Sequence, residues 1–171
     1  MKCYNEGAII YFQLEGFAVK QRVDYVKTAP EAFQIMLKFE EYAKTTGFDR
    51  KLVELIKIRA SQLNGCAYCL DMHTKDTRAI GETEQRIYLL NAWREAPFYS
   101  EAERAALELT EAVTLISAGG VSDELYERVR AHFDEKQYVD LIILINTINC
   151  WNRLSISMAN VPGSYQPAVK Q

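Results

Sequence analysis

The residues best suited to chemistry lie close together between positions 54 and 73. Cys66, Cys69 and His73 follow one another at spacings of three and four residues, and Glu54 precedes Cys66 by twelve. In one helix, residues at positions i, i+3 and i+7 share a face. The spacing therefore predicts that two thiols and an imidazole project to one side of the same helix.

These side chains are suited to thiol redox chemistry. A cysteine attacks an electrophile as its thiolate, so a helix N-terminus or a nearby imidazolium activates it by lowering the thiol pKa. A second cysteine three residues away can capture the oxidised first cysteine as a disulfide and protect it from further oxidation. Glu54 belongs to the preceding helix, and a bent helical hairpin could return it toward the pair as a proton acceptor.

Two other interpretations of the same residues stay open. Cys66, Cys69 and His73 could supply three zinc ligands, but a structural zinc site takes a fourth. The sequence has no second Cys-x-x-Cys and no His-x-x-x-His. The cysteines could also be buried and inert, which the polar neighbours Asn64 and Asp71 argue against. Redox chemistry without a metal or cofactor is therefore the prediction.

The remaining cysteines, histidine and tryptophans are expected to be structural. Cys3 and Cys150 have no spaced partner, and Cys150, in an apolar helix, is expected to be a small buried side chain. His132 is expected at a helix end or on the surface. Trp93 and Trp151 are expected to anchor a core or an interface. Four glutamates are expected to form a solvated helix face: Glu101, Glu103, Glu108 and Glu111.

Helices are expected to position these residues along almost the whole chain. Thr28–Glu31 and Ser100–Glu103 have the capping-box pattern, while Asp49 and Ser122 can each cap a helix. Glycines mark several ends, including a break at Asn64-Gly65. The expected helical segments are 28–47, 49–64, 66–80, 83–97, 100–119, a short one after 122, and 134–158. Helices joined by short turns indicate an all-α, single-domain helical bundle.

Composition excludes several other classes of protein. The chain has 171 residues, of which 49% are hydrophobic and 25% charged, as in ordinary globular domains. A net charge of −3 without a basic run gives no reason to expect nucleic acid or a membrane surface as a partner. No apolar run approaches the roughly 20 residues of a membrane span, and no targeting segment is evident. The cytoplasm, where thiols stay reduced, is the expected location.

The spacing of the four chemical residues resembles a known family signature. Glu54, eleven residues, Cys66-x-x-Cys69, three residues and His73 resemble the alkylhydroperoxidase D-like branch of the carboxymuconolactone decarboxylase superfamily. Arg22–Glu31 resembles the usual opening of that family, and Val139–Leu154 its closing helix. The resemblance places the domain at 22–160, with an extension at 1–21 and a tail at 161–171. Within the extension, Ala8–Phe12 could be an edge strand, an added arm or a tail, and the extension could lie upstream of the natural start.

The resemblance implies a fold, an activity and roles for the residues. It implies an all-helical homo-oligomer, commonly a trimer or hexamer, that reduces hydroperoxides without haem or metal and is re-reduced by a dithiol or protein reductant. Cys69 would attack the peroxide, Cys66 would resolve it as a disulfide, and Glu54 and His73 would relay protons. Helix-dipole reasoning alone would instead favour Cys66 as the thiol of lower pKa.

One residue departs from the family pattern. Tyr68 stands where the founding branch has a histidine, immediately before the second cysteine. A phenol with an ordinary pKa near 10 is a poor proton shuttle at neutral pH, although it can orient water or substrate. The departure keeps two further hypotheses open: a thiol–disulfide relay between proteins with little peroxidase activity, and a non-enzymatic oxidative-stress sensor.

Overall fold

The computed structural model describes residues 20–167, and all regular structure in that part is helical. This confirms the all-α prediction. Ala8–Phe12, within the extension predicted at 1–21, lies outside the described residues, and the predicted domain boundaries stay predictions. The elements are α1 (Tyr25–Thr28), α2 (Pro30–Thr45), α3 (Arg50–Asn64), α4 (Ala67–Ala79), α5 (Glu84–Tyr88), η1 (Leu90–Ala92), α6 (Glu101–Thr114), η2 (Ile116–Ala118), α7 (Asp123–Arg130) and α8 (Glu135–Ser157).

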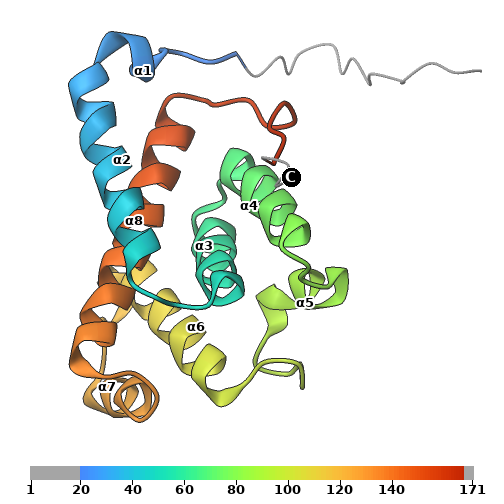
Figure 1. Cartoon of the computed structure of the whole chain (residues 1–171), viewed down its shortest axis with the longest axis vertical. Coiled ribbons are helices and arrows are strands. Elements are labelled where there is room, and N and C mark those ends of the chain that lie inside the picture. Colours follow the sequence, from blue (N-terminus) through green and yellow to red (C-terminus); the bar gives the residue numbers. More distant parts are fainter. Residues whose placement is uncertain (1–19, 168–171) are drawn as a thin grey trace, which may run out of the picture.

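Helix α3 is the centre of the bundle. It packs against α4, α6 and α8, with α2 and α8 on one side and α4 on the other (Figure 1). Leu52 and Ile56 face a core shared with α6, α7 and α8, whereas Leu55 and Ile58 face a second core with η1 and Trp93. Burial on two faces fixes the rotation of α3 and therefore the position of Glu54.

The turn between α3 and α4 is the break expected at Asn64-Gly65. Gly65 ends α3 with a φ of 68°, a left-handed conformation that favours glycine. Its N–H donates to the carbonyl of Gln62, and the chain re-enters a helix at once, with Cys66 as the N-cap of α4. One short turn therefore sets the thiol pair at a helix N-terminus.

Other helix boundaries confirm some predicted caps and correct others. The Ser100–Glu103 capping box is present, and Asp49 and Ser122 both cap helices. The box predicted at Thr28–Glu31 is wrong: Ala29 is the N-cap of α2 without a side-chain hydrogen bond. The residue before a proline is disfavoured in the helical conformation, and Pro30 at the first helical position fixes the start instead.

Two predicted helices are shorter than expected. The segment 83–97 is helical only to Tyr88, after which a 3₁₀ turn carries Leu90 and Trp93 into the core. The helix expected to reach residue 119 ends at Thr114 and continues as a second 3₁₀ turn. Helical periodicity placed both helix ends too late in the chain. The first helix ends early because Leu90 and Trp93 pack into the core, whereas the second 3₁₀ turn buries none of its residues.

Buried amides join the α3–α4 turn to α8. Asn64 donates hydrogen bonds of 2.8 Å to the side-chain carbonyls of both Asn149 and Asn152, and Asn152 donates to Ser61 at 3.0 Å. Asn152 is fully buried. These bonds hold the turn beside the cysteines against the longest helix.

We expect Asn152→Ala to lower the free energy of unfolding by about 1–3 kcal/mol, because it removes the hydrogen bonds that the fully buried Asn152 amide makes with Asn64 and Ser61. Urea denaturation followed by circular dichroism measures the change. Asn146→Ala, at an exposed position of the same helix, is the matched control. Equal stability of the two variants would contradict a structural role for the amide network.

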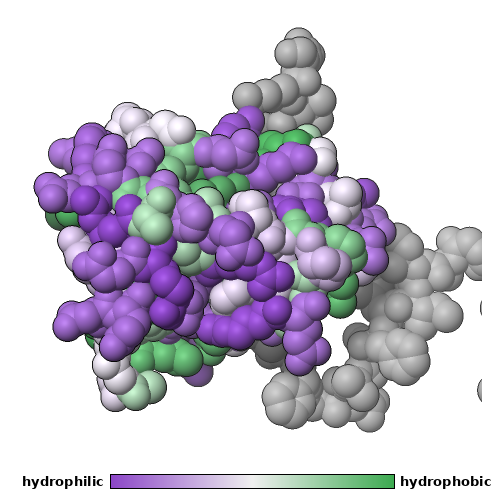
Figure 2. Space-filling view, turned by 90° about the horizontal axis from the view of Figure 1, so that it is seen from below, coloured by the Kyte–Doolittle hydropathy of each residue, from purple (hydrophilic) through white to green (hydrophobic). Residues whose placement is uncertain are grey.

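One face of the described residues is mainly polar. Seen from below in Figure 1, that end of the bundle is largely hydrophilic with separate hydrophobic patches (Figure 2). Among residues 20–167, no helix is long and apolar enough to cross a membrane.

Candidate active site

The two cysteines lie in the first turn of α4 and form a disulfide. The Cα atoms of Cys66 and Cys69 are 5.4 Å apart, and the backbone N–H of Cys69 donates to the sulfur of Cys66 at 3.3 Å. Each residue is only 1% exposed. The positive end of the helix dipole and a backbone donor both favour a thiolate at Cys66 when the pair is reduced.

Glu54 and His73 meet across the α3–α4 interface. Nδ1 of His73 lies 2.8 Å from Oε2 of Glu54, with 6% and 16% of the two side chains exposed. Burial acts to raise the pKa of Glu54, but the hydrogen bond and charge of His73, with the charges of Lys57 and Arg50, lower it overall. An ionised Glu54 only accepts, so Nδ1 of His73 carries the proton of this hydrogen bond, and Nε2 is the ring nitrogen left to accept a proton from a thiol.

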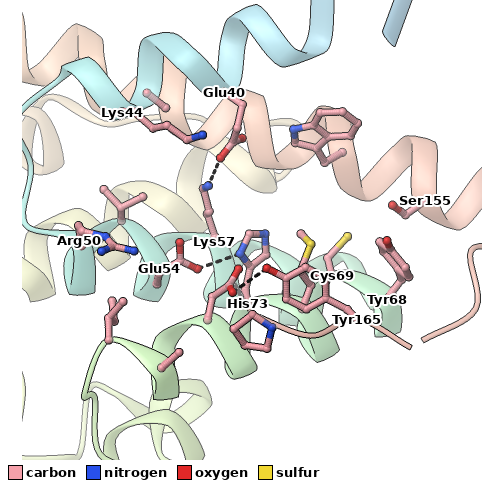
Figure 3. Close-up of a pocket in the computed structure, with 18 of the residues that line it drawn as sticks. Glu40, Lys44, Arg50, Glu54, Lys57, Tyr68, Cys69, His73, Ser155 and Tyr165 are labelled. Carbon is pink, nitrogen blue, oxygen red and sulfur yellow. Dashed lines mark hydrogen bonds and ion pairs between the residues drawn. The ribbon is translucent and has the colours of Figure 1, made fainter. Parts of the chain in front are cut away.

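A buried ion pair above Glu54 was not predicted from the sequence. Lys57 is 5% exposed and its ammonium pairs with Glu40 of α2 (Figure 3). Lys57 follows Glu54 by three residues, so both lie on one face of α3. The pair links α2 to the site and adds positive charge near Glu54. The sequence of α3 does not indicate that Lys57 is buried, because its partner Glu40 belongs to another helix.

All but one of the predicted site residues border a single cavity of about 1220 Å³ between α2, α3, α4 and α8 (Figure 3). Glu54, Tyr68, Cys69 and His73 line it, whereas Cys66 does not. The apolar part of its wall includes Phe33, Phe48, Met72 and Trp151. The structure therefore gives the two thiols different environments, with Cys69 facing the cavity.

The segment that follows α8 contributes a tyrosine that sequence patterns did not indicate. Tyr165 lines the same cavity, and its hydroxyl donates to Oδ1 of Asp76 at 2.7 Å. Residues 161–171 were predicted only as a tail. Tyr165 lies more than ninety residues from the motif, so only folding brings it there.

Three side chains in the described part offer ligand atoms close to one another. Single atoms of Glu54, His73 and Asp76 lie within 4.8 Å of one another. All three groups are already engaged: His73 and Glu54 with each other, and Asp76 with Tyr165. The sulfurs of Cys66 and Cys69 bond to each other, so the Cys66–Cys69–His73 set considered for zinc is not assembled in this arrangement.

Two predictions outside the site are wrong. Cys150 is exposed, because it lies on the outer face of α8, whereas the apolar run around it faces inward. Glu103 and Glu111 do not form a solvated face: Glu103 pairs with Arg86, and Glu111 accepts from Arg59 and from the indole of Trp93. Trp93 is a core residue as predicted. Cys3 lies outside the described residues.

Fold and site together define a class of all-helical proteins with a Cys-x-x-Cys pair next to a Glu–His pair. Residues 30–112 match the carboxymuconolactone decarboxylase family. The uncharacterized protein YdfG of Bacillus subtilis is 59% identical over 142 residues, which cover 83% of this chain and 97% of YdfG. The chain therefore belongs to the carboxymuconolactone decarboxylase family, among its alkylhydroperoxidase D-like proteins.

Solved structures agree with this assignment. ATU0492 of Agrobacterium tumefaciens, a protein of unknown function suggested to be an antioxidant defence protein AhpD, is 41% identical with a TM-score of 0.80. The match covers 88% of this chain and all of ATU0492. The debrominase Bmp8 shares the fold, with 18% identity and a TM-score of 0.73. This match covers 81% of this chain and 75% of Bmp8.

Proposed function

We propose that this protein is a thiol-dependent peroxidase that reduces small hydroperoxides through Cys69 and Cys66. The observation that carries the proposal is the cavity wall, where Cys69, paired with Cys66, lies beside a buried Glu54–His73 hydrogen bond. A nucleophile, a base and a residue that orients the base are the parts that activated-thiol chemistry requires. The suggested antioxidant role of ATU0492 is consistent with this activity.

The reaction balances with these residues and a dithiol. His73, held by Glu54, takes the proton of Cys69, and the thiolate attacks an oxygen of the hydroperoxide. The S–O bond forms, the O–O bond breaks, and the alkoxide leaves as an alcohol with a proton from the relay. Cys66 then attacks the sulfenic acid, forming the disulfide and releasing water. A dithiol reduces the disulfide and is itself oxidised.

The environments of the two sulfurs support this order of attack. Cys69 borders the cavity and lies one helical turn before His73, whereas Cys66 does not border the cavity and is the N-cap of α4. Helix-dipole reasoning favours a stable thiolate at Cys66, which makes Cys66 the better leaving group when a dithiol attacks Cys69. In this proposal, Cys66 is therefore the cysteine with the lower thiol pKa, whereas Cys69 is the cysteine that attacks the peroxide.

Tyr68 takes a supporting role in the proposal. Its side chain lines the cavity (Figure 3), where a phenol can donate a hydrogen bond to a bound hydroperoxide or water. It replaces a histidine of the founding branch, so the proton pathway runs through His73 and Glu54 alone.

Burial weighs against the alternative of a thiol–disulfide relay between proteins. Both cysteines are 1% exposed, and a partner protein must bring its thiolate in line with one of the sulfurs. A hydroperoxide or a slender dithiol reaches a buried sulfur through a cavity more readily than a protein surface does. A sensor without catalysis would not require the Glu54–His73 pair.

We further propose that the chain works as a homo-oligomer, a trimer or hexamer, in a reducing compartment such as the cytoplasm. Ile35, Phe39 and Tyr42 share one face of α2 at helical spacing and are 58%, 42% and 43% exposed. Ile35→Glu is expected to lower the mass measured by light scattering, whereas Lys38→Glu, on the same helix, leaves it unchanged. A single-chain mass for the native protein would refute the oligomer.

The decisive test starts from the fully reduced, metal-free protein. Stopped-flow mixing with hydrogen peroxide and with cumene hydroperoxide, followed by mass analysis, is expected to show rapid formation of the Cys66–Cys69 disulfide. Slow reaction with every hydroperoxide, together with rapid exchange against a protein disulfide, would overturn the peroxidase proposal in favour of the relay.

A further inference from the structure

The segment after α8 returns across the bundle and is fastened to α4. The backbone N–H of Gly163 donates to Asp71 at 2.9 Å, and Lys75 donates to the carbonyl of Tyr165 at 3.0 Å. Lys75 also pairs with Asp71. Asp71 and Lys75 lie one turn apart on α4, just beyond Cys69. These bonds fix the backbone on both sides of Ser164 and determine where the side chain of Tyr165 can reach.

Tyr165 points from this segment into the cavity beside His73 (Figure 3). Its hydroxyl donates to Asp76 at 2.7 Å, and its ring is half-buried. Burial, the hydrogen bond to Asp76 and the nearby charge of Glu54 raise the pKa of Tyr165 to about 12. Tyr165 therefore keeps its proton at neutral pH and acts as a donor, not as a base.

Asp76 is a second carboxylate next to the proton relay. It follows His73 by three residues on α4, and its carboxylate lies within 4.8 Å of the paired groups of Glu54 and His73. A negative charge this close raises the pKa of neighbouring acids and stabilises an imidazolium. The other charged or titratable groups bordering this cavity are Tyr25, Glu40, Lys44, Arg50, Lys57, Tyr68, Cys69 and Tyr165.

We propose that Tyr165 is a positioning and specificity-determining residue of the site. Its hydroxyl holds the Asp76 carboxylate and reduces the negative charge acting on His73 and Glu54, while its ring forms part of the wall of the cavity that receives the hydroperoxide. The ring's role rests on the peroxidase function proposed above, whereas the hydroxyl's role concerns the thiols alone. A purely structural role, in which Tyr165 only fastens the chain end to α4, would leave the pH dependence of the thiols unchanged.

The hydroxyl is tested without any peroxide. Iodoacetamide alkylation of the reduced protein is measured between pH 5 and 9 in roughly half-unit steps, with the site located by peptide fragmentation. Tyr165→Phe keeps the ring but removes the hydrogen bond to Asp76. The midpoint pH at which Cys69 becomes alkylated is therefore expected to rise by about 0.5–1 pH unit. Asp76→Asn is expected to move it downward, because the charge is lost.

The double variant separates a direct effect from an indirect one. If Tyr165 acts through Asp76, adding Tyr165→Phe to Asp76→Asn produces no further shift. Tyr126→Phe is the matched control and leaves the profile unchanged, because Tyr126 lies on α7 and packs edge-on against Tyr138 of α8. Two results would overturn the inference. One is the same pH profile in the native protein and in Tyr165→Phe. The other is an equal shift from Tyr165→Phe in the native protein and in Asp76→Asn. Circular dichroism verifies that each variant is folded.

The ring is tested by substrate size. Tyr165→Ala is expected to change the ratio of kcat/KM for cumene hydroperoxide over hydrogen peroxide by at least about fivefold, about 1 kcal/mol, and Tyr165→Phe to restore it. An unchanged ratio in Tyr165→Ala would refute the specificity role. If the native protein consumes no peroxide, the peroxidase proposal fails, while the alkylation profiles still decide whether Tyr165 acts on the relay.

Discussion

Cys69→Ser is expected to reduce peroxide consumption to the uncatalysed background, a loss of at least about 10³-fold. Cys69 is the cysteine that borders the cavity, and a serine hydroxyl in its place has no comparable nucleophilicity. Peroxide consumption in the presence of dithiothreitol measures the effect. The buried site should remain folded, because oxygen replaces sulfur with little change in shape.

Two further cysteine variants make the assignment specific. Cys66→Ser is expected to react once and accumulate a sulfenic acid on Cys69, detected by mass after dimedone trapping. Cys150→Ser is the matched control, since Cys150 is exposed on the outer face of α8, and should keep native turnover. Native turnover in Cys69→Ser, or sulfenic acid located on Cys66 in the native protein, would refute the proposed order of attack.

Glu54→Gln is expected to lower kcat/KM at neutral pH by about 10²-fold or more, as the loss of a proton-transfer partner does in other enzymes. Glutamine can still accept from Nδ1 of His73, so the ring keeps its position, but the amide cannot share the charge of the imidazolium. Stopped-flow measurement of thiolate oxidation across pH 5–9 tests this. An unaltered pH–rate curve would remove Glu54 from the relay.

The direction of the pH dependence follows from the lowered pKa of Glu54. Burial opposes ionisation, but His73, Lys57 and Arg50 keep the carboxylate charged at neutral pH. Its contribution to activity and to stability is therefore present above the ordinary glutamate range and is lost as pH falls through the lowered pKa. Glu95→Gln, at an exposed carboxylate before α6, is the matched control and should leave the curve unchanged.

Local sequence determined the helices and the thiol end of the site. Helical periodicity, the caps at Asp49, Ser100 and Ser122, and the glycine break at Gly65 are signals between residues near in the chain, and the structure has all of them. The spacing of Cys66, Cys69 and His73 placed them within one helical segment for the same reason. Backbone geometry converts the spacing of Cys69 and His73 into a shared face of α4, whereas Cys66 is the N-cap and does not border the cavity.

Long-range packing decided which partners those residues meet. Glu54 reaches His73 because α3 is buried on two faces and its rotation is fixed by both cores. Glu40 pairs with Lys57 from another helix, and Tyr165 arrives from beyond α8. Packing also decided that Cys69, and not Cys66, borders the cavity. The sequence by itself determined which groups could do thiol chemistry, because spacing along one helix is a local property. Only the tertiary structure decided what surrounds them, because contacts between distant segments depend on how the whole core closes.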